Sequence, residues 1–134
     1  MRRRDFESVF DIERAIRQDE EAILLLSSEL EHPSSPRLTG MPGSSRRRDR
    51  IGDGVARMEK LKARLEEDRR RLLGLRLEIL ELEQSIDDVH IRVIVHERFF
   101  NLREWRDVAV FAGGPNTEQS VSKAYYRWAE RNLE

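Results

Sequence analysis

Residues 51–86 read IGDGVARMEKLKARLEEDRRRLLGLRLEILELEQSI, and this stretch decides the fold. An apolar side chain returns at every seventh position, at Ile51, Met58, Leu65, Leu72, Ile79 and Ile86. The companion positions, three residues further along, are Gly54, Leu61, Asp68, Leu75, Leu82 and Val89. Because a seven-residue apolar repeat forms one stripe along a helix, the pattern predicts a long coiled-coil helix over residues 49–85.

The segment before it, residues 1–32, is predicted to be an acidic amphipathic helix with a stripe of its own. Its apolar positions share the heptad spacing, at Val9, Ile16, Ile23, Leu30, Ile12 and Leu26. Residues 5–32 carry a net charge of -7, whereas residues 1–4 carry +3. The two stripes predict an all-α fold in which the helices form a coiled coil or helical hairpin. We expect both an antiparallel pairing within the chain and a homodimer through the long helix.

Each stripe contains one acid, Asp19 in the first helix and Asp68 in the second. An ionised carboxylate is costly in an apolar seam unless it is paired or reaches water. We therefore expect each acid to lie at an edge or to meet an arginine such as Arg14 or Arg69.

Between the two helices lies a Ser/Pro/Gly/Arg loop, predicted over residues 33–48. It holds three of the four prolines together with Arg37 and Arg46–Arg48, and Arg50 follows directly after it. Proline and glycine at this density oppose a helix, and a loop of this length is uncommon without a function. The arginines fit either a solvated basic linker or a set of phosphate contacts.

Composition excludes several classes of function. The chain has no cysteine, so it has neither disulfides nor thiolate metal ligands, which fits a cytoplasmic protein. No run of apolar residues is long enough for a signal peptide core or a membrane span. His90 and His96 are six positions apart and share no helix face. The sequence predicts no metal, no cofactor and no catalytic site, and hence a protein that is not an enzyme.

Residues 86–134 are predicted to form a separate helical domain. A helix starts near Asp87 or Asp88, whose carboxylates suit the free amides of a first turn. A short helix over REWRDVAVFA, the turn GGPN and a last helix capped by Asn116 or Thr117 follow. One face of the last helix is predicted to face the core and holds Val121, Ala124, Tyr125 and Trp128.

The opposite face of that last helix is polar and long-armed, as in a helix that reads bases in the major groove of DNA. The residues predicted to contact base edges are Glu118, Gln119, Ser122 and Lys123. The residues predicted to contact phosphates are Arg103, Arg106, Thr117, Tyr126, Arg127 and Arg131. Two short helices joined by a turn occur in many other proteins, so this pattern alone leaves the function open.

The run SIDDVHIRVIVHERFFNLREWRDVAVFA resembles the helix-turn-helix of region four of sigma factors. The likeness is carried by Asp88, Arg92-Val93-Ile94, Glu97-Arg98-Phe99, Trp105 and Val108-Ala109. The chain resembles even more the small phage activators of late transcription, the RinA/ArpU type. Those proteins also have an N-terminal helical part, a Ser/Pro/Gly loop, a long heptad helix and such a terminal domain.

This resemblance implies a phage or prophage transcriptional activator in the bacterial cytoplasm. Residues 86–134 would then be a helix-turn-helix domain that binds double-stranded DNA, with RNA polymerase or a sigma factor as a further partner. The alternative is a coiled-coil interaction or assembly protein without base-specific contacts. In that case the acidic first helix would steer basic protein partners.

Overall fold

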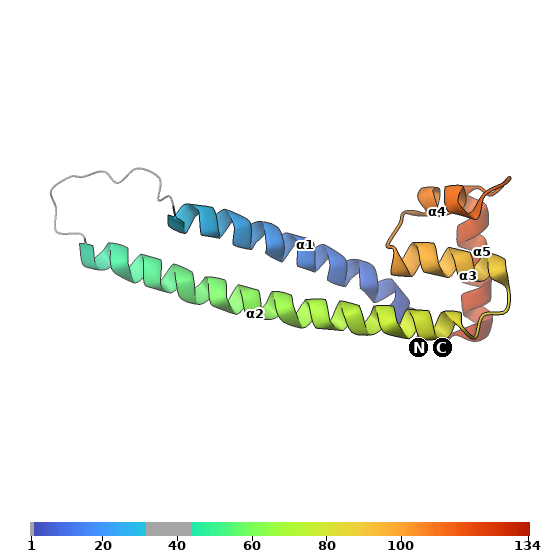
Figure 1. The fold of residues 1–134 in the computed structure, drawn as a ribbon, viewed down its shortest axis with the longest axis horizontal. Helices are drawn as coiled ribbons and strands as arrows, with labels where there is room; N and C mark the ends of the chain where they lie inside the picture. Colours follow the sequence, from blue (N-terminus) through green and yellow to red (C-terminus); the bar gives the residue numbers. More distant parts are fainter. Residues whose placement is uncertain (1, 32–43) are drawn as a thin grey trace. The chain divides into compact units, whose positions relative to one another are not determined.

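The computed structural model describes residues 2–31 and 44–134, with side chains from residue 50 onward in the second stretch. The elements are α1 (Arg3–Glu31), α2 (Ser44–Glu83), α3 (Val89–Val95), the π-helical turn η1 (His96–Phe100), α4 (Trp105–Ala112) and α5 (Glu118–Asn132) (Figure 1). No strand occurs in these two described stretches, so the predicted all-α class is confirmed. None of the described helices is both long and apolar enough to cross a membrane.

The chain divides into two compact units, and α1 and α2 each contribute to both. The terminal unit consists of Met1–Glu13 with Arg71–Glu134, and the hairpin unit consists of Arg14–Arg70. The packing of the chain thus places the unit boundaries after Glu13 and after Arg70, whereas the sequence predicted a domain boundary at residue 86. The terminal unit takes the start of α1 and the end of α2 in addition to α3, α4 and α5.

In the hairpin unit, α1 and α2 run antiparallel (Figure 1). Asp19 bonds to Arg64, and eight residues further along α1 the hydroxyl of Ser27 lies 3.5 Å from the sulfur of Met58. The partners on α2 thus come earlier in the chain as α1 proceeds. The antiparallel pairing predicted from the two stripes is present within one chain.

Asp19 meets an arginine, but a different one from those named in the prediction. Its side chain is buried, and its two oxygens accept bonds from Nη2 and Nε of Arg64 at 2.8 and 3.1 Å. Arg69 instead bonds to Glu20 at 3.2 Å and to Glu66 at 2.9 Å. In the antiparallel pair Arg64 lies directly opposite Asp19. The two residues are 45 positions apart, so the local sequence around Asp19 does not indicate this partner.

The long helix begins at Ser44 and ends at Glu83, whereas the sequence predicted 49–85. Arginine is a good helix former, so the run Arg46–Arg48 extends the helix once the last proline of the loop has passed. The end of α2 is a tight turn in which the hydroxyl of Ser85 donates to the carbonyl of Leu82 at 2.7 Å. Of the loop predicted over residues 33–48, residues 33–43 lie outside the described residues, and residues 44–48 belong to α2 instead.

The core of the terminal unit is aromatic. Phe99 contacts Phe6 edge to face, with ring centroids 5.2 Å apart, and lies 4.8 Å from Tyr125 and 6.4 Å from Trp105. Phe6 and Tyr125 are almost completely buried, at 0% and 1% exposed. Because Phe6 belongs to α1, the first helix supplies part of the core on which the C-terminal helices rest.

Candidate nucleic-acid interface

The first helix of the C-terminal segment starts where the sequence indicated. The carboxylate of Asp88 accepts bonds from the backbone amides of His90 at 2.9 Å and Ile91 at 3.4 Å. About two turns later the helix widens into η1, and the chain leaves it through Leu102, whose φ is +56°. A left-handed conformation is uncommon for leucine, and no local pattern of residues indicates it here.

Arg98, on this widened turn, fixes the chain that leads into α4. Its guanidinium lies between two rings, 4.1 Å from the centroid of Phe10 and 4.6 Å from that of Trp105. Nη1 of Arg98 also donates to the carbonyl of Arg103 at 2.8 Å. Burial lowers the pKa of Arg98, and cation–π contacts with two rings compensate for part of its lost hydration. The start of α4 is thereby held on the aromatic core.

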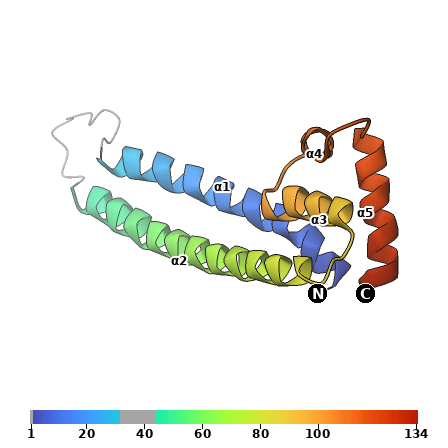
Figure 2. The ribbon, with the colours of Figure 1, turned by 45° about the vertical axis from the view of Figure 1, so that its right-hand side comes forward.

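The helices α4 and α5 cross one another (Figure 2) and are joined by a turn built on two glycines. Gly113 and Gly114 have φ of +74° and +62°, values that glycine adopts without steric cost. Thr117 caps α5 because its hydroxyl oxygen accepts from the amide of Ser120, and the Thr117 amide in turn donates to the hydroxyl oxygen of Ser120. Of the two predicted caps, Thr117 is the one used.

The four residues predicted to contact base edges come together on the first two turns of α5. Glu118, Gln119 and Lys123 are exposed and Ser122 is half-buried, with its hydroxyl donating to the carbonyl of Gln119 at 3.1 Å. An open concavity of about 350 Å³ lies on this face. It is lined by Thr117, Gln119, Ser120, Lys123 and Arg127. On the other side of α5, Val121, Tyr125 and Ala129 are buried in the core.

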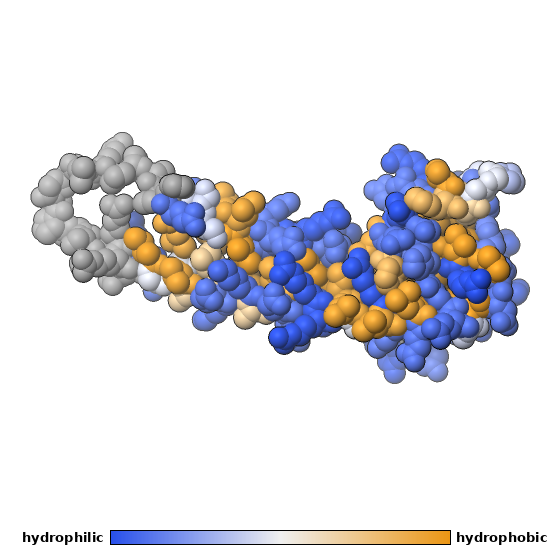
Figure 3. Space-filling model, in the orientation of Figure 1, coloured by the Kyte–Doolittle hydropathy of each residue, from blue (hydrophilic) through white to orange (hydrophobic). Residues whose placement is uncertain are grey.

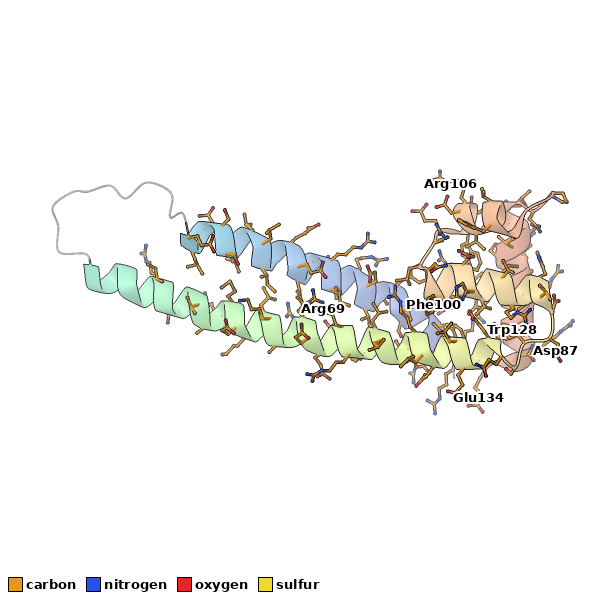
Figure 4. All side chains as sticks on the ribbon, viewed as in Figure 1. Arg69, Asp87, Phe100, Arg106, Trp128 and Glu134 are labelled. Atoms are coloured by element: carbon orange, nitrogen blue, oxygen red, sulfur yellow. The ribbon has the colours of Figure 1, made fainter. Side chains whose placement is uncertain are left out.

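The residues predicted to contact phosphates differ in how they are held. Arg127 and Arg131 are exposed on α5, and the side chain of Arg106 on α4 is 76% exposed and points away from the helix (Figure 4). Arg103, in contrast, donates from Nε to Glu97 at 2.7 Å and lies 3.9 Å from the ring centroid of Phe111. Arg106 has only a long ion pair with Glu104, at 3.8 Å between two exposed side chains, so Arg106 and Arg127 are better placed for phosphates than Arg103.

One cation near α5 was missed as a member of this surface. The guanidinium of Arg3 lies 5.1 Å from the ring centroid of Tyr126, and the Arg3 amide donates to the carbonyl of Glu134 at 3.1 Å. The Arg2–Arg4 run therefore lies beside the last helix. Phe6 could have indicated this contact, because it is an aromatic residue outside the apolar stripe of the first helix and so needs another packing partner.

Two buried side chains of this unit, Tyr125 and Glu83, carry polar groups whose pKa is raised by burial. Burial raises the pKa of Tyr125, whose hydroxyl makes no hydrogen bond within the described residues. Glu83 is buried and lies 2.9 Å from Nδ1 of His96, and burial, opposed by His96, raises the pKa of its carboxyl. Across residues 2–31 and 44–134, no three or more His, Cys, Asp or Glu are grouped to hold a metal ion.

Comparison with protein-family models, with curated proteins and with solved structures finds no match to this chain.

Proposed function

We propose that the terminal unit binds duplex DNA with α5 in the major groove, and that the protein regulates transcription. The observation that carries this proposal is the exposed polar face of α5, with Gln119, Lys123 and Arg127 beside a capped N-terminus. The major groove admits one α-helix, and lysine and glutamine side chains pair with guanine and adenine edges there. The buried opposite face of α5 gives this surface a rigid support.

Phosphate contacts would come from Arg106, Arg127 and Arg131, with Tyr126 and Arg3 beside them. Such contacts position a protein on the duplex but do not specify sequence. Acidic Glu118 and Glu130 share α5, so the charge available from one protomer is small. We therefore propose that the protein acts as a homodimer or together with RNA polymerase or a sigma factor, as the resemblance to the RinA/ArpU-type activators implies.

The test is binding of the full chain to the DNA that flanks its own gene, followed by footprinting. Lys123→Ala should weaken the preferred site by about 1–3 kcal/mol and relax the preference at one base pair. Arg127→Ala should weaken all duplexes alike and reduce the salt slope by about one. Arg92→Ala, at an exposed arginine of α3, is the control and should leave both quantities unchanged. Absence of duplex binding at low salt would refute the proposal.

A protein-interaction role is the second candidate, supported by the hairpin unit. Leu24 and Leu25 are 74% and 64% exposed, and apolar surface is visible on this part of the molecule in Figure 3. Next to Leu24 lies a concavity of about 520 Å³ with Ile23 and Leu65 among its lining residues. Exposed apolar patches often mark protein contacts. Retention of a co-purifying protein after nuclease treatment, and its loss in Leu24→Glu, would favour this role.

A further inference from the structure

The seam of the hairpin unit has two flanks that differ in how their charges are paired. On one flank, Arg69 reaches from α2 to Glu20 of α1 at 3.2 Å and also bonds to Glu66 (Figure 4). On the other flank, Arg57 and Arg64 stand one position before the stripe residues Met58 and Leu65. Lys60 lies between these two arginines, within about one helical turn of each. We name Arg57, Lys60 and Arg64 the basic flank.

Few acids of α1 face the basic flank. In an antiparallel coiled coil, the residues just before the stripe positions of one helix face the residues just before the stripe positions of the other. In α1 the residues at such positions include Ala15, Ala22 and Glu29. Within the described residues, neither Arg57 nor Lys60 forms an ion pair. The small alanines therefore leave the basic flank open.

Arg64 is only partly engaged by its bonds to Asp19. Its side chain is 65% exposed, and it uses Nε and one N–H of Nη2 for the buried carboxylate. Since a guanidinium has five N–H donors, three remain free to contact another anion. The pair with Asp19 raises the pKa of Arg64 and fixes the plane of its guanidinium.

The basic flank borders a concavity of about 340 Å³, whose lining is Arg57, Lys60, Leu61 and Arg64. Three of these four residues are cations. A protein partner would need an apolar centre that can be desolvated, which this lining does not offer. Cations on successive turns of one helix instead suit a row of phosphates, which attracts them by releasing counterions.

We propose that the basic flank is a second DNA-binding surface, which contacts the sugar–phosphate backbone of the duplex outside the site read by α5. The proposal rests on the proposed function, because the ligand is the same DNA. It adds a sequence-independent contribution from a part of the chain that neither composition nor the resemblance assigned to DNA. The wild-type protein should accordingly bind a long duplex more tightly than a duplex trimmed to the α5 site.

The test compares the full chain with the double variant Arg57→Gln/Lys60→Gln on a 40-base-pair duplex, over a series of salt concentrations. Each lost phosphate contact removes about 0.9 from the slope of log K against log salt, so the slope should fall by about two. The affinity should fall about tenfold at moderate salt. The matched control is Lys62→Gln/Arg70→Gln, which removes two exposed cations from the same stretch of α2 outside the basic flank. Its slope should change by less than about one.

The possible outcomes separate the two proposals. If the wild type binds and Arg57→Gln/Lys60→Gln keeps its slope, or if both double variants lose the same slope, the second surface is refuted and the role of α5 stands. If the wild type binds no duplex, the proposed function fails and the inference fails with it. A second measurement is the binding of each protein to poly-glutamate, an acidic polypeptide. If Arg57→Gln/Lys60→Gln loses poly-glutamate binding but keeps its DNA binding, the second DNA surface is refuted in favour of an acidic protein partner. Circular dichroism of each variant checks that α2 is intact.

Discussion

The same two helices are held in different ways in the two units. In the terminal unit the side chains of Phe6, Val9, Ile79 and Tyr125 are at most 1% exposed, and they come from three helices, α1, α2 and α5. In the hairpin unit only two helices meet, and Leu26 and Ile51 of the apolar stripes are 40% and 41% exposed. A stripe with one partner helix leaves its edges in water, whereas a surrounded stripe buries fully.

This difference shows that an unbroken heptad pattern does not by itself indicate uniform packing. Leu72 and Ile79, in the terminal unit, are 6% and 0% exposed, whereas Ile51, in the same phase of the repeat but in the hairpin unit, is 41% exposed. Buried apolar area is the main stabilising contribution, at roughly 25 cal/mol per Å². The terminal unit should therefore be the more stable of the two, and substitutions should have larger effects there.

The largest effect is expected from Phe6→Ala in α1. Truncating a fully buried phenylalanine costs about 3–5 kcal/mol, and here it also removes the edge-to-face contact with Phe99. We expect the free energy of unfolding to fall by that amount and the near-ultraviolet signal of Trp105 and Trp128 to weaken. Chemical denaturation followed by circular dichroism measures both quantities.

The control for Phe6→Ala is Leu24→Ala, in the same helix but in the hairpin unit. Leu24 is 74% exposed, so its truncation should change stability by less than about 0.5 kcal/mol. Similar losses for the two variants would show that α1 is one structural element with uniform packing. That result would abolish the contrast between the units.

A smaller effect is expected from Asp88→Ala at the start of α3. The change removes a side-chain cap with two amide bonds, and loss of such a cap costs about 1 kcal/mol. Asp87→Ala is the matched control, since Asp87 is exposed and its carboxylate makes no hydrogen bond in the described part of the chain. Denaturant midpoints that fall equally for both variants would indicate a general charge effect instead of a cap.

Local signals in the sequence predicted the helices and caps of this protein well. The heptad at Leu65, Leu72 and Ile79 predicted the long helix, and Asp88 and Thr117 were named among the candidate caps. Each of these signals acts over a few residues, through helix periodicity or through a side chain that bonds to nearby amides. The antiparallel pairing also followed, since two stripes in one chain need a partner.

Contacts between distant residues were the ones that the sequence did not predict. Arg64 was not recognised as the partner of Asp19, 45 positions away, and Phe6 was not placed against Phe99. Nothing in the local sequence indicated the left-handed Leu102. For the candidate site, the grouping of Gln119 and Lys123 on α5 followed from helical spacing, but the pairing of Arg103 with Glu97 depends on how η1 turns the chain.

Two glycines of α2, Gly52 and Gly54, differ in how closely α1 approaches them in the hairpin unit. A Cβ at Gly52 would meet nothing within 4 Å, whereas one at Gly54 would lie 3.3 Å from Cδ2 of Leu30. Gly52→Ala should therefore stabilise the helix by about 0.5–1 kcal/mol through its better helix propensity. Gly54→Ala should gain less, because Leu30 must move. Thermal melting measures the difference, and an equal gain would mean that α1 does not pack closely on α2 at this point.

The smallest effect is a pH dependence at Glu83 in the terminal unit. Burial raises the pKa of this carboxyl above its ordinary value of 4.5, so the folded state holds the proton more tightly than the unfolded state. Its contribution to stability is complete below about pH 4.5 and is lost as the pH rises through the folded-state pKa. Glu83→Gln has no proton to lose, so the stability of the wild type minus that of the variant should decrease as the pH rises above about 4.5. Urea titrations across this range measure it, and a difference that grows with pH would show that the bond to His96 outweighs burial.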